Sequence, residues 1–298
     1  DGTINHVSAS SGSATSIFAN ADNYENCWKF VEWFSRDDIQ EKYATNVEGV
    51  KQVRSINEID SMAVNLRKEL GEDSMSPIDI FAIAKTMPEL TTVLYPLGSN
   101  ISGMCIKGEG ASLIAINSGM SLGRQRFSMA HEFYHLHFDS EVKKSVCSIA
   151  INGGDEKERE ADLFASHFLL PSAALYNVLK DSNAVSLEEV VWLEQHFGMS
   201  RQAILYRLKS EGKIDSNLYN KMQVDVQYSA AKLGYDTDLY KATPAGSNMK
   251  TTGQYIRMAD KLYSEKIIST GKYEEMLLDA FREDLVFGDD NEGDEIID

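Results

Sequence analysis

The chain has few cysteines, few basic residues and no long apolar run. Cys27, Cys105 and Cys147 are odd in number and follow no metal-binding spacing. They fit a reducing cytoplasm and predict neither a disulfide framework nor a cysteine-based metal site, and we expect Cys105 and Cys147 to be core thiols. No stretch of about 18 apolar residues occurs, so we expect no membrane span. The net charge of −17 argues against direct binding to nucleic acid phosphates.

Both ends of the chain are polar. Residues 1–19 are Ser-rich and lack the basic-then-apolar order of a signal peptide. The segment 289–298 holds six acidic residues and is expected to be a solvated tail. The length of 298 residues is typical of about two globular domains. We predict an N-terminal helical extension over 1–52, a catalytic domain over 53–175 and a C-terminal helical domain over 176–298.

Hydrophobic periodicity predicts an α+β fold that is predominantly helical. Apolar residues within 56–70 recur at helical spacing. Ser76 followed by Pro77 predicts the N-cap and first position of a second helix, which would end near residue 85. Three strand-like runs follow, at 90–97, 101–107 and 111–117. Glycine-containing turns separate them, so we expect a small three-stranded antiparallel sheet.

The second half of the chain is predicted to be helical. One helix is expected over 156–170, and Ser186 with Glu189 forms a capping box that opens another. Residues 186–213 are also typical of a helix-turn-helix. The basic residues on or near its second helix are Arg201, Arg207, Lys209 and Lys213. Further helices are expected near 253–268 and 273–281.

One stretch carries a pattern whose spacing alone indicates a chemistry. It is His131-Glu132-x-x-His135, and three of the chain's six histidines fall within seven residues there. On a helix, residues four apart project from the same face, so both imidazoles can bind one Zn²⁺. Glu132 lies beside them and can reach a water held by the metal. We predict a zinc site with His131 and His135 as ligands and Glu132 as the catalytic base.

A catalytic zinc site needs a third protein ligand and one open position. The helix expected from residue 156 offers Glu158 and Asp162, which share one face because they are four residues apart. Glu158 would bind the metal, and Asp162 would accept the outer N–H of a ligand histidine. Glu160 projects from a different side of the helix and is the alternative third ligand.

Other polar residues near the motif receive no catalytic role. His137 projects away from His135 and is expected to pack or to face solvent. His167 lies between phenylalanines and is expected to be a partly buried histidine with a hydrogen-bond partner. Neither Tyr134 nor His137 projects toward the site, so no residue is assigned to stabilise the oxyanion.

These motifs resemble those of the ImmA/IrrE family of zinc-dependent metallopeptidases. The likeness includes Ile101-Ser-Gly103-Met, Arg124-Gln-Arg-Phe-Ser-Met-Ala-His131-Glu132-x-x-His135 and Glu158-x-x-Ala161-Asp162. It implies a compact, zincin-like fold of the gluzincin type with Glu158 as the third ligand. It also implies a cytoplasmic enzyme that cleaves a helix-turn-helix repressor, often encoded nearby on a mobile element, and so induces transcription. Residues 26–43 are similar instead to the C-terminal end of bacterial extracellular solute-binding proteins, which suggests a gene fusion or a chimeric sequence.

The sequence leaves three functions open. The first is a zinc endopeptidase whose substrate lies extended along an edge of the sheet, with Glu132 moving the proton from the attacking water to the leaving amine. The second is a regulatory protein that keeps the metal and docks onto a repressor without cleaving it. The third is a DNA-binding regulator that acts through residues 186–213, and the acidic net charge argues against it.

Overall fold

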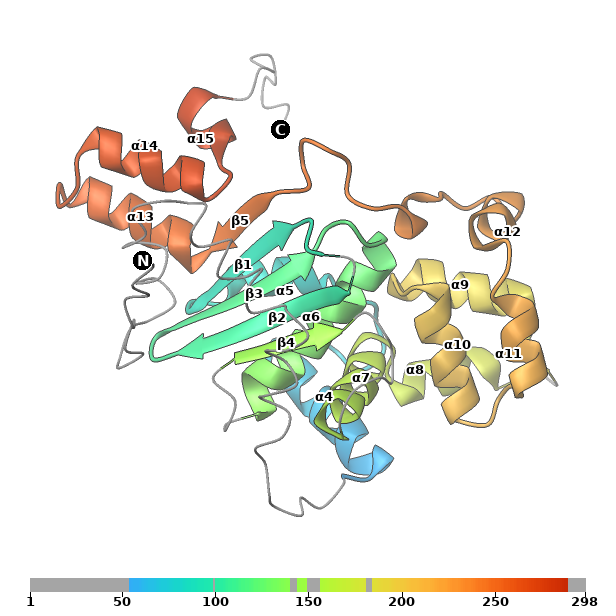
Figure 1. The fold of residues 1–298 in the computed structure, drawn as a ribbon. Coiled ribbons are helices and arrows are strands. Elements are labelled where there is room, and N and C mark those ends of the chain that lie inside the picture. Colours follow the sequence, from blue (N-terminus) through green and yellow to red (C-terminus); the bar gives the residue numbers. More distant parts are fainter. Residues whose placement is uncertain (1–53, 99, 140–143, 149–155, 181–183, 289–298) are drawn as a thin grey trace, which may run out of the picture.

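The computed structural model of the chain describes residues 54–98, 100–139, 144–148, 156–180 and 184–288. The N-terminal extension predicted over 1–52 and the acidic tail lie outside these residues. Within them the fold is α+β and rich in helix, with one sheet packed against helices (Figure 1). No helix in this part of the chain is long and apolar enough to cross a bilayer.

The sheet is mixed and has five strands among the described residues, in the order β4-β2-β3-β1-β5. β2 and β3 form an antiparallel hairpin, and β1 runs parallel to β3. β4 and β5 pair antiparallel with β2 and β1 at the two edges. The strands are β1 (Leu90–Tyr95), β2 (Ile101–Gly108), β3 (Ala111–Asn117), β4 (Lys144–Ser148) and β5 (Lys250–Gly253).

The predicted three-stranded antiparallel sheet is wrong in its pairing, although its three strands lie where the sequence places them. β1 pairs in parallel with β3 and is not a neighbour of β2. The link after β1 crosses the end of β3, where Ser118 N donates to Tyr95 O at 3.0 Å. Asn117 Nδ2 donates to Ile101 O at 2.7 Å at the same end. These contacts carry the chain across β3, so β2 enters on the far side of that strand.

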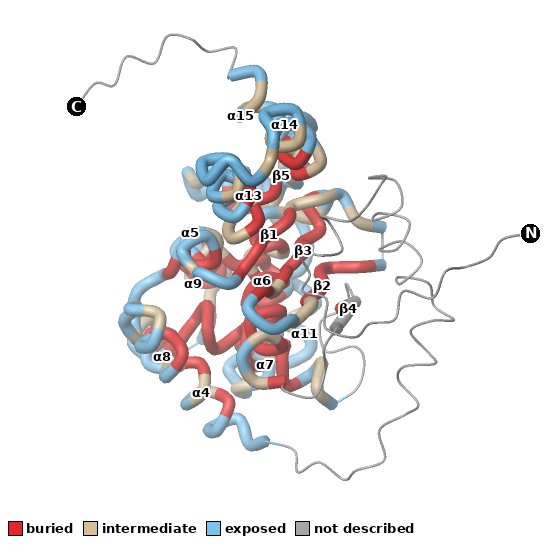
Figure 2. The backbone as a smooth tube through the Cα atoms, turned by 90° about the vertical axis from the view of Figure 1, so that its left-hand side faces the viewer, coloured by how far each residue is buried: buried red, intermediate tan, exposed pale blue. Residues whose placement is uncertain are grey.

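Three helices form a layer against the sheet, and their apolar side chains contribute to the core. α6 (Leu122–Phe138) packs against β2 and β3, α7 (Glu156–Leu169) packs on α6, and α4 (Ile56–Glu69) packs on α7. Phe133 on α6 lies 6.1 Å from Phe168 on α7, measured between ring centroids. Figure 2 shows that α6 and α7 are buried along much of their length. α6 is therefore fixed both by the sheet and by a second helix.

One core cluster extends from Ile59 to Met222. It includes side chains of α8 (Ser172–Leu179), α9 (Leu187–Phe197), α10 (Arg201–Ser210) and α11 (Ser216–Met222). The boundary between 175 and 176 stays a prediction. A separate cluster joins α13 (Gln254–Ser264) to α14 (Thr270–Asp279). The remaining elements are α12 (Val226–Lys232), a 3-10 turn at Asp238–Tyr240 and α15 (Glu283–Phe287).

The helix starts follow from side-chain caps. The capping box of Ser186 and Glu189 opens α9 as the sequence predicts. The helix predicted to begin at Ser76 is α5 (Ile80–Thr86). It begins later than predicted, because Asp79 rather than Ser76 accepts hydrogen bonds from its first N–H groups. Ser76 N instead donates to Asp73 Oδ1 at 2.6 Å, which holds a turn ahead of the helix.

Two arginines of the expected helix-turn-helix lie inside the protein. Arg201 on α10 is 3% exposed and binds Glu194 of α9. Arg207 is fully buried and binds Glu211 and the hydroxyl of Ser172. A buried, paired guanidinium cannot bind a phosphate in a DNA backbone. α9 and α10 therefore form a packing unit in which these two cations tie the helices to their neighbours.

Candidate metal centre

α6 presents His131 and His135 on one side. Both side chains are buried, and their Nε2 atoms lie 3.2 Å apart. The apolar side chains of α6, among them Phe133, pack into the core and fix the rotation of the helix. The structure thus brings the two imidazoles together, as the spacing of the motif predicts.

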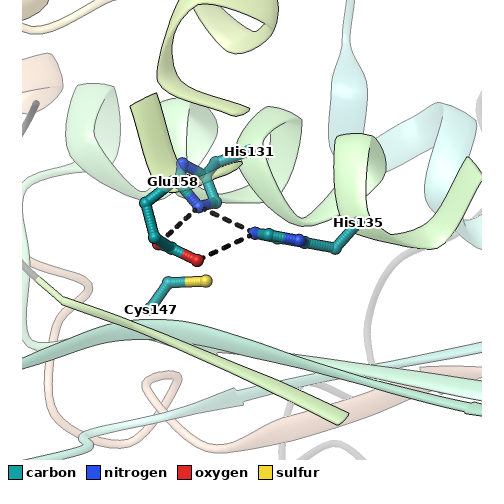
Figure 3. Close-up of side chains that lie close together, drawn as sticks. All are labelled: His131, His135, Cys147 and Glu158. Carbon is teal, nitrogen blue, oxygen red and sulfur yellow. Dashed lines mark hydrogen bonds and ion pairs between the residues drawn. The ribbon is translucent and has the colours of Figure 1, made fainter. Parts of the chain in front are cut away.

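Glu158 on α7 completes a triangle with these histidines. Its Oε2 lies 3.2 Å from His131 Nε2, and its Oε1 lies 3.3 Å from His135 Nε2 (Figure 3). Glu160 lies elsewhere, because its carboxylate accepts hydrogen bonds from Tyr134 Oη at 2.5 Å and from Arg54 Nη1 at 2.8 Å. Of the two glutamates considered as a third ligand, Glu158 is the one beside the histidines.

Carboxylates lie behind both imidazoles. His131 Nδ1 is 2.8 Å from Asp162 Oδ1, which is the contact expected for Asp162. His135 Nδ1 is 3.6 Å from Asp139 Oδ2, and Asp139 also binds Lys157 Nζ at 2.9 Å. Asp139 was not among the predicted site residues, although its place four residues after His135 puts it on the same side of the helix. Such partners orient a ring so that its Nε2 lone pair faces the centre of the group.

Glu132 is fully buried beside the triangle and lies against strand β2. A Cβ atom built on Gly103, in the middle of β2, would come within 2.8 Å of Glu132 Oε1. A glycine inside a strand often marks such a close approach, but the sequence alone does not show what approaches. Gly103 therefore creates the space in which the Glu132 carboxylate lies.

Cys147 is a fourth member of the group. It lies on β4, is 1% exposed, and pairs with Gly103 in the ladder between β4 and β2. One donor atom each from His131, His135, Glu158 and Cys147 lies within 4.8 Å of the others. Figure 3 shows the thiol approaching the three α-helical side chains from the sheet. Cys147 is buried, as expected of a core thiol, and its sulfur also lies among these possible ligand atoms.

The charges of the group are strongly coupled. Burial disfavours the charged form of His131, but Asp162 and Glu158 outweigh burial and raise the pKa of this imidazole well above its ordinary value. Burial also opposes ionisation of Glu158, yet the two histidines lower the pKa of its carboxyl. Burial raises the pKa of Glu132, and the histidines oppose that rise only in part. The group therefore stabilises positive charge between its carboxylates, which is the requirement for holding a divalent cation.

The donor set fits Zn²⁺. Zinc binds imidazole nitrogen and carboxylate oxygen at about 2.0–2.2 Å in tetrahedral geometry, so two of its ligand atoms lie roughly 3.3–3.5 Å apart. The distances between the donor atoms of His131, His135 and Glu158 are 3.2, 3.2 and 3.3 Å. One ion fits among these three side chains with little movement of any of them.

The remaining polar residues near the motif have structural partners. Tyr134 donates to Glu160. The ring of His137 packs edge-on against Phe133 at 5.8 Å between centroids. His167 is buried, and its Nδ1 lies 2.7 Å from Asp60 Oδ1, so the expected hydrogen-bond partner is present. These residues do not belong to the group that contains Glu158.

Comparison with known proteins agrees with this geometry. Residues 96–209 match the model of a peptidase family whose description is IrrE N-terminal-like domain. This part of the chain is similar to an IrrE N-terminal-like domain. The matched part begins just after β1 and includes β2, α6, β4 and α7. It therefore contains all four members of the group, together with Glu132, Gly103 and Asp162.

One curated relative is similar to part of this chain. The uncharacterized protein YqaB of Bacillus subtilis (strain 168) is 27% identical over 111 residues. These residues are 36% of this chain and 63% of YqaB, so the chain spans less than two thirds of that relative's length. Outside the matched residues 96–209 lie α4, α5, β1, α11 to α15 and β5.

Proposed function

We propose that the chain is a zinc-dependent endopeptidase that cleaves a regulatory protein, namely a helix-turn-helix transcriptional repressor. The observation that carries this proposal is the convergence of His131, His135 and Glu158 to within 3.3 Å of one another, with Glu132 buried beside them. A peptidase family model matches the part of the chain that contains these residues. The repressor as substrate rests on the likeness of the motifs to the ImmA/IrrE family.

His131, His135 and Glu158 would hold the metal. A zinc ion held there supplies a Lewis acid that polarises the scissile carbonyl and makes water more acidic. Asp162 fixes the ring of His131, and Asp139 lies behind His135. These carboxylates keep both Nε2 atoms aimed at the same point, so the ligands need little reorganisation when the ion binds.

Glu132 would move the proton. Its carboxylate accepts a proton from the attacking water and passes it to the nitrogen of the leaving amine. Burial raises the pKa of Glu132, which brings this carboxyl closer to the pH at which it must both accept and release a proton. Gly103 keeps the strand clear of the carboxylate, so the base faces the ligand group rather than a side chain of β2.

A second function, docking onto a repressor without cleavage, is favoured by one observation. The thiol of Cys147 lies within the ligand group, and a site closed by four protein ligands is typical of structural zinc. DNA binding through residues 186–213 has less support, because Arg201 and Arg207 are buried and paired.

Cleavage separates the first two functions. The full chain and its Glu132→Gln variant would each be co-expressed with a helix-turn-helix repressor encoded near the gene, and repressor fragments identified by mass spectrometry. We expect fragments with the unchanged chain, and intact repressor with Glu132→Gln at unchanged zinc content. A stable complex with intact repressor, the same for both proteins, would establish docking instead.

A further inference from the structure

The thiol of Cys147 lies where a hydrolytic site needs free space. Its Sγ belongs to the set of donor atoms that lie within 4.8 Å of one another. The same thiol donates a hydrogen bond to the carboxylate of Glu132. The side chain thus contacts both the ligand triangle and the proposed base, and a water attacking a peptide bond has to contact the same two groups.

The placement of Cys147 follows from the strand register. Cys147 pairs with Gly103, and Ser102 Oγ donates to the carbonyl oxygen of Cys147 at 3.2 Å. Because Gly103 has no side chain, Glu132 from α6 and Cys147 from β4 can both reach the same space. Cys105, two residues further along β2, is equally buried but lies outside the donor group. The pairing of β4 with β2 therefore places the thiol of Cys147, and not that of Cys105, in the donor group.

We propose that Cys147 is a fourth protein ligand of the metal and that β4 thereby holds the site in a closed resting state. This inference rests on the proposed function and concerns the regulation of the same site. Two histidines, one glutamate and one cysteine then form a closed tetrahedral shell, whereas a catalytic site keeps one position open. In the closed state the protein retains zinc but has no position for the attacking water.

The proton released when the thiol of Cys147 binds zinc has an acceptor nearby. Coordination breaks the S–H bond of Cys147 and forms a sulfur–zinc bond, and the proton passes to the carboxylate of Glu132, which accepts the hydrogen bond of that thiol. A zinc–sulfur distance of about 2.3 Å puts sulfur roughly 3.6 Å from the nitrogen ligands. The thiol therefore reaches its position from within 4.8 Å by a shift on the order of 1 Å.

β4 also forms the edge of the sheet beside the metal site. It pairs with β2 through Met104–Val146 and Cys105–Ser145, and its other edge pairs with no strand among the described residues. An extended peptide that binds by strand addition would add at that edge of β4. A shift of β4 on substrate binding would withdraw the thiol of Cys147 from the metal, so substrate binding would open the metal site.

X-ray absorption at the zinc edge tests the ligand directly in the zinc-loaded full chain. We expect a sulfur shell at about 2.3 Å beside nitrogen and oxygen at about 2.0–2.2 Å. Cys147→Ala should lose the sulfur shell and keep bound zinc, while the matched variant Cys105→Ala should keep both. A wild-type spectrum without sulfur, or a sulfur shell that survives Cys147→Ala, would overturn the proposal.

Cleavage of the repressor tests the closed state separately. If one molecule in about ten is open at rest, Cys147→Ala raises kcat/KM roughly tenfold, and Cys105→Ala leaves it unchanged. Equal rates for wild type and Cys147→Ala, with the sulfur shell present in wild type, would overturn the closed resting state. If both proteins leave the repressor intact, the proposed peptidase function fails, and the sulfur shell still decides whether Cys147 is a ligand.

Discussion

Gly103 on β2 lies so close to Glu132 on α6 that a Cβ atom at residue 103 would stand 2.8 Å from Glu132 Oε1. Ala115 O and the side chain of Ile116 lie at 3.1 and 3.2 Å from the same point, so a methyl group there has no free direction. The position of the proposed base is thus set by the absence of a side chain on the neighbouring strand.

We expect Gly103→Ala to displace the carboxylate of Glu132. A misplacement of about 1 Å can lower the rate roughly 100-fold, so kcat/KM should fall by that order while zinc content stays unchanged. The measurement is repressor cleavage together with metal analysis. Gly98→Ala is the matched control, because a Cβ at Gly98 meets no atom within 4 Å. Equal activity of the two variants would show that Gly103 does not position the base.

The two glutamates of α7 should separate metal binding from stability. Glu158→Gln should lower zinc affinity more than about 100-fold, since the residues behind a ligand alone contribute about 10–100-fold. Glu160→Gln should keep zinc and lower the free energy of unfolding by about 1 kcal/mol, because it weakens the contacts to Tyr134 and the partly exposed Arg54. Competition with a chelator and denaturant unfolding measure the two effects. Loss of zinc from Glu160→Gln alone would reverse the assignment.

Asp162→Asn should weaken zinc binding without removing a ligand. A neutral amide in place of the carboxylate stabilises the Nδ1–H form of His131 less strongly, so we expect a loss of about 10–100-fold in affinity. Asp260→Asn on α13, where the aspartate is exposed, should leave affinity unchanged. If the two variants bind zinc equally well, Asp162 does not orient His131.

His167 should make stability depend on pH. Burial and Arg207 lower the pKa of this imidazole and outweigh Asp60. Below the ordinary histidine pKa of about 6.5, the unfolded chain therefore binds more protons than the folded one, and stability falls as the pH falls toward the lower folded pKa. With zinc present throughout, we expect His167→Gln to be less stable near pH 7 but to lose less stability on acidification.

Chemical unfolding at a series of pH values checks this expectation. His196→Gln is the control, because His196 is exposed and stacks on Trp192. Its unfolding free energy should follow the wild-type slope between about pH 7 and pH 5. If the unfolding free energy of His167→Gln falls with decreasing pH as steeply as that of wild type, other groups cause the pH dependence.

The sequence was sufficient to predict those site residues whose relative positions are set within a single helix. Helical spacing brings His131 to His135, and it gives Glu158 and Asp162 a common face on α7. Cys147 and Gly103 could not be found this way, because their roles depend on the pairing of β4 with β2. That pairing joins short segments about 40 residues apart, and no local pattern specifies it.

The fold likewise divides into helices that local sequence patterns predict and strand pairings that they do not. The helices over 56–69 and 156–169 were predictable from apolar periodicity and breakers. The parallel pairing of β1 with β3 was not, since it depends on contacts of Asn117 and Ser118 with the link that crosses β3. β5 has only four residues and finds its place by pairing with β1, which lies more than 150 residues earlier in the chain.

Hydrolysis in water enriched in the heavy oxygen isotope tests the central claim most directly. Peptide-bond cleavage by an attacking water adds one solvent oxygen to the new carboxyl terminus of the repressor fragment, and mass spectrometry reads that label. The account predicts labelled fragments with the zinc-loaded chain and none with Glu132→Gln, although this variant still binds zinc. Repressor that stays intact with the zinc-loaded chain, in both its wild-type and Cys147→Ala forms, would contradict the account.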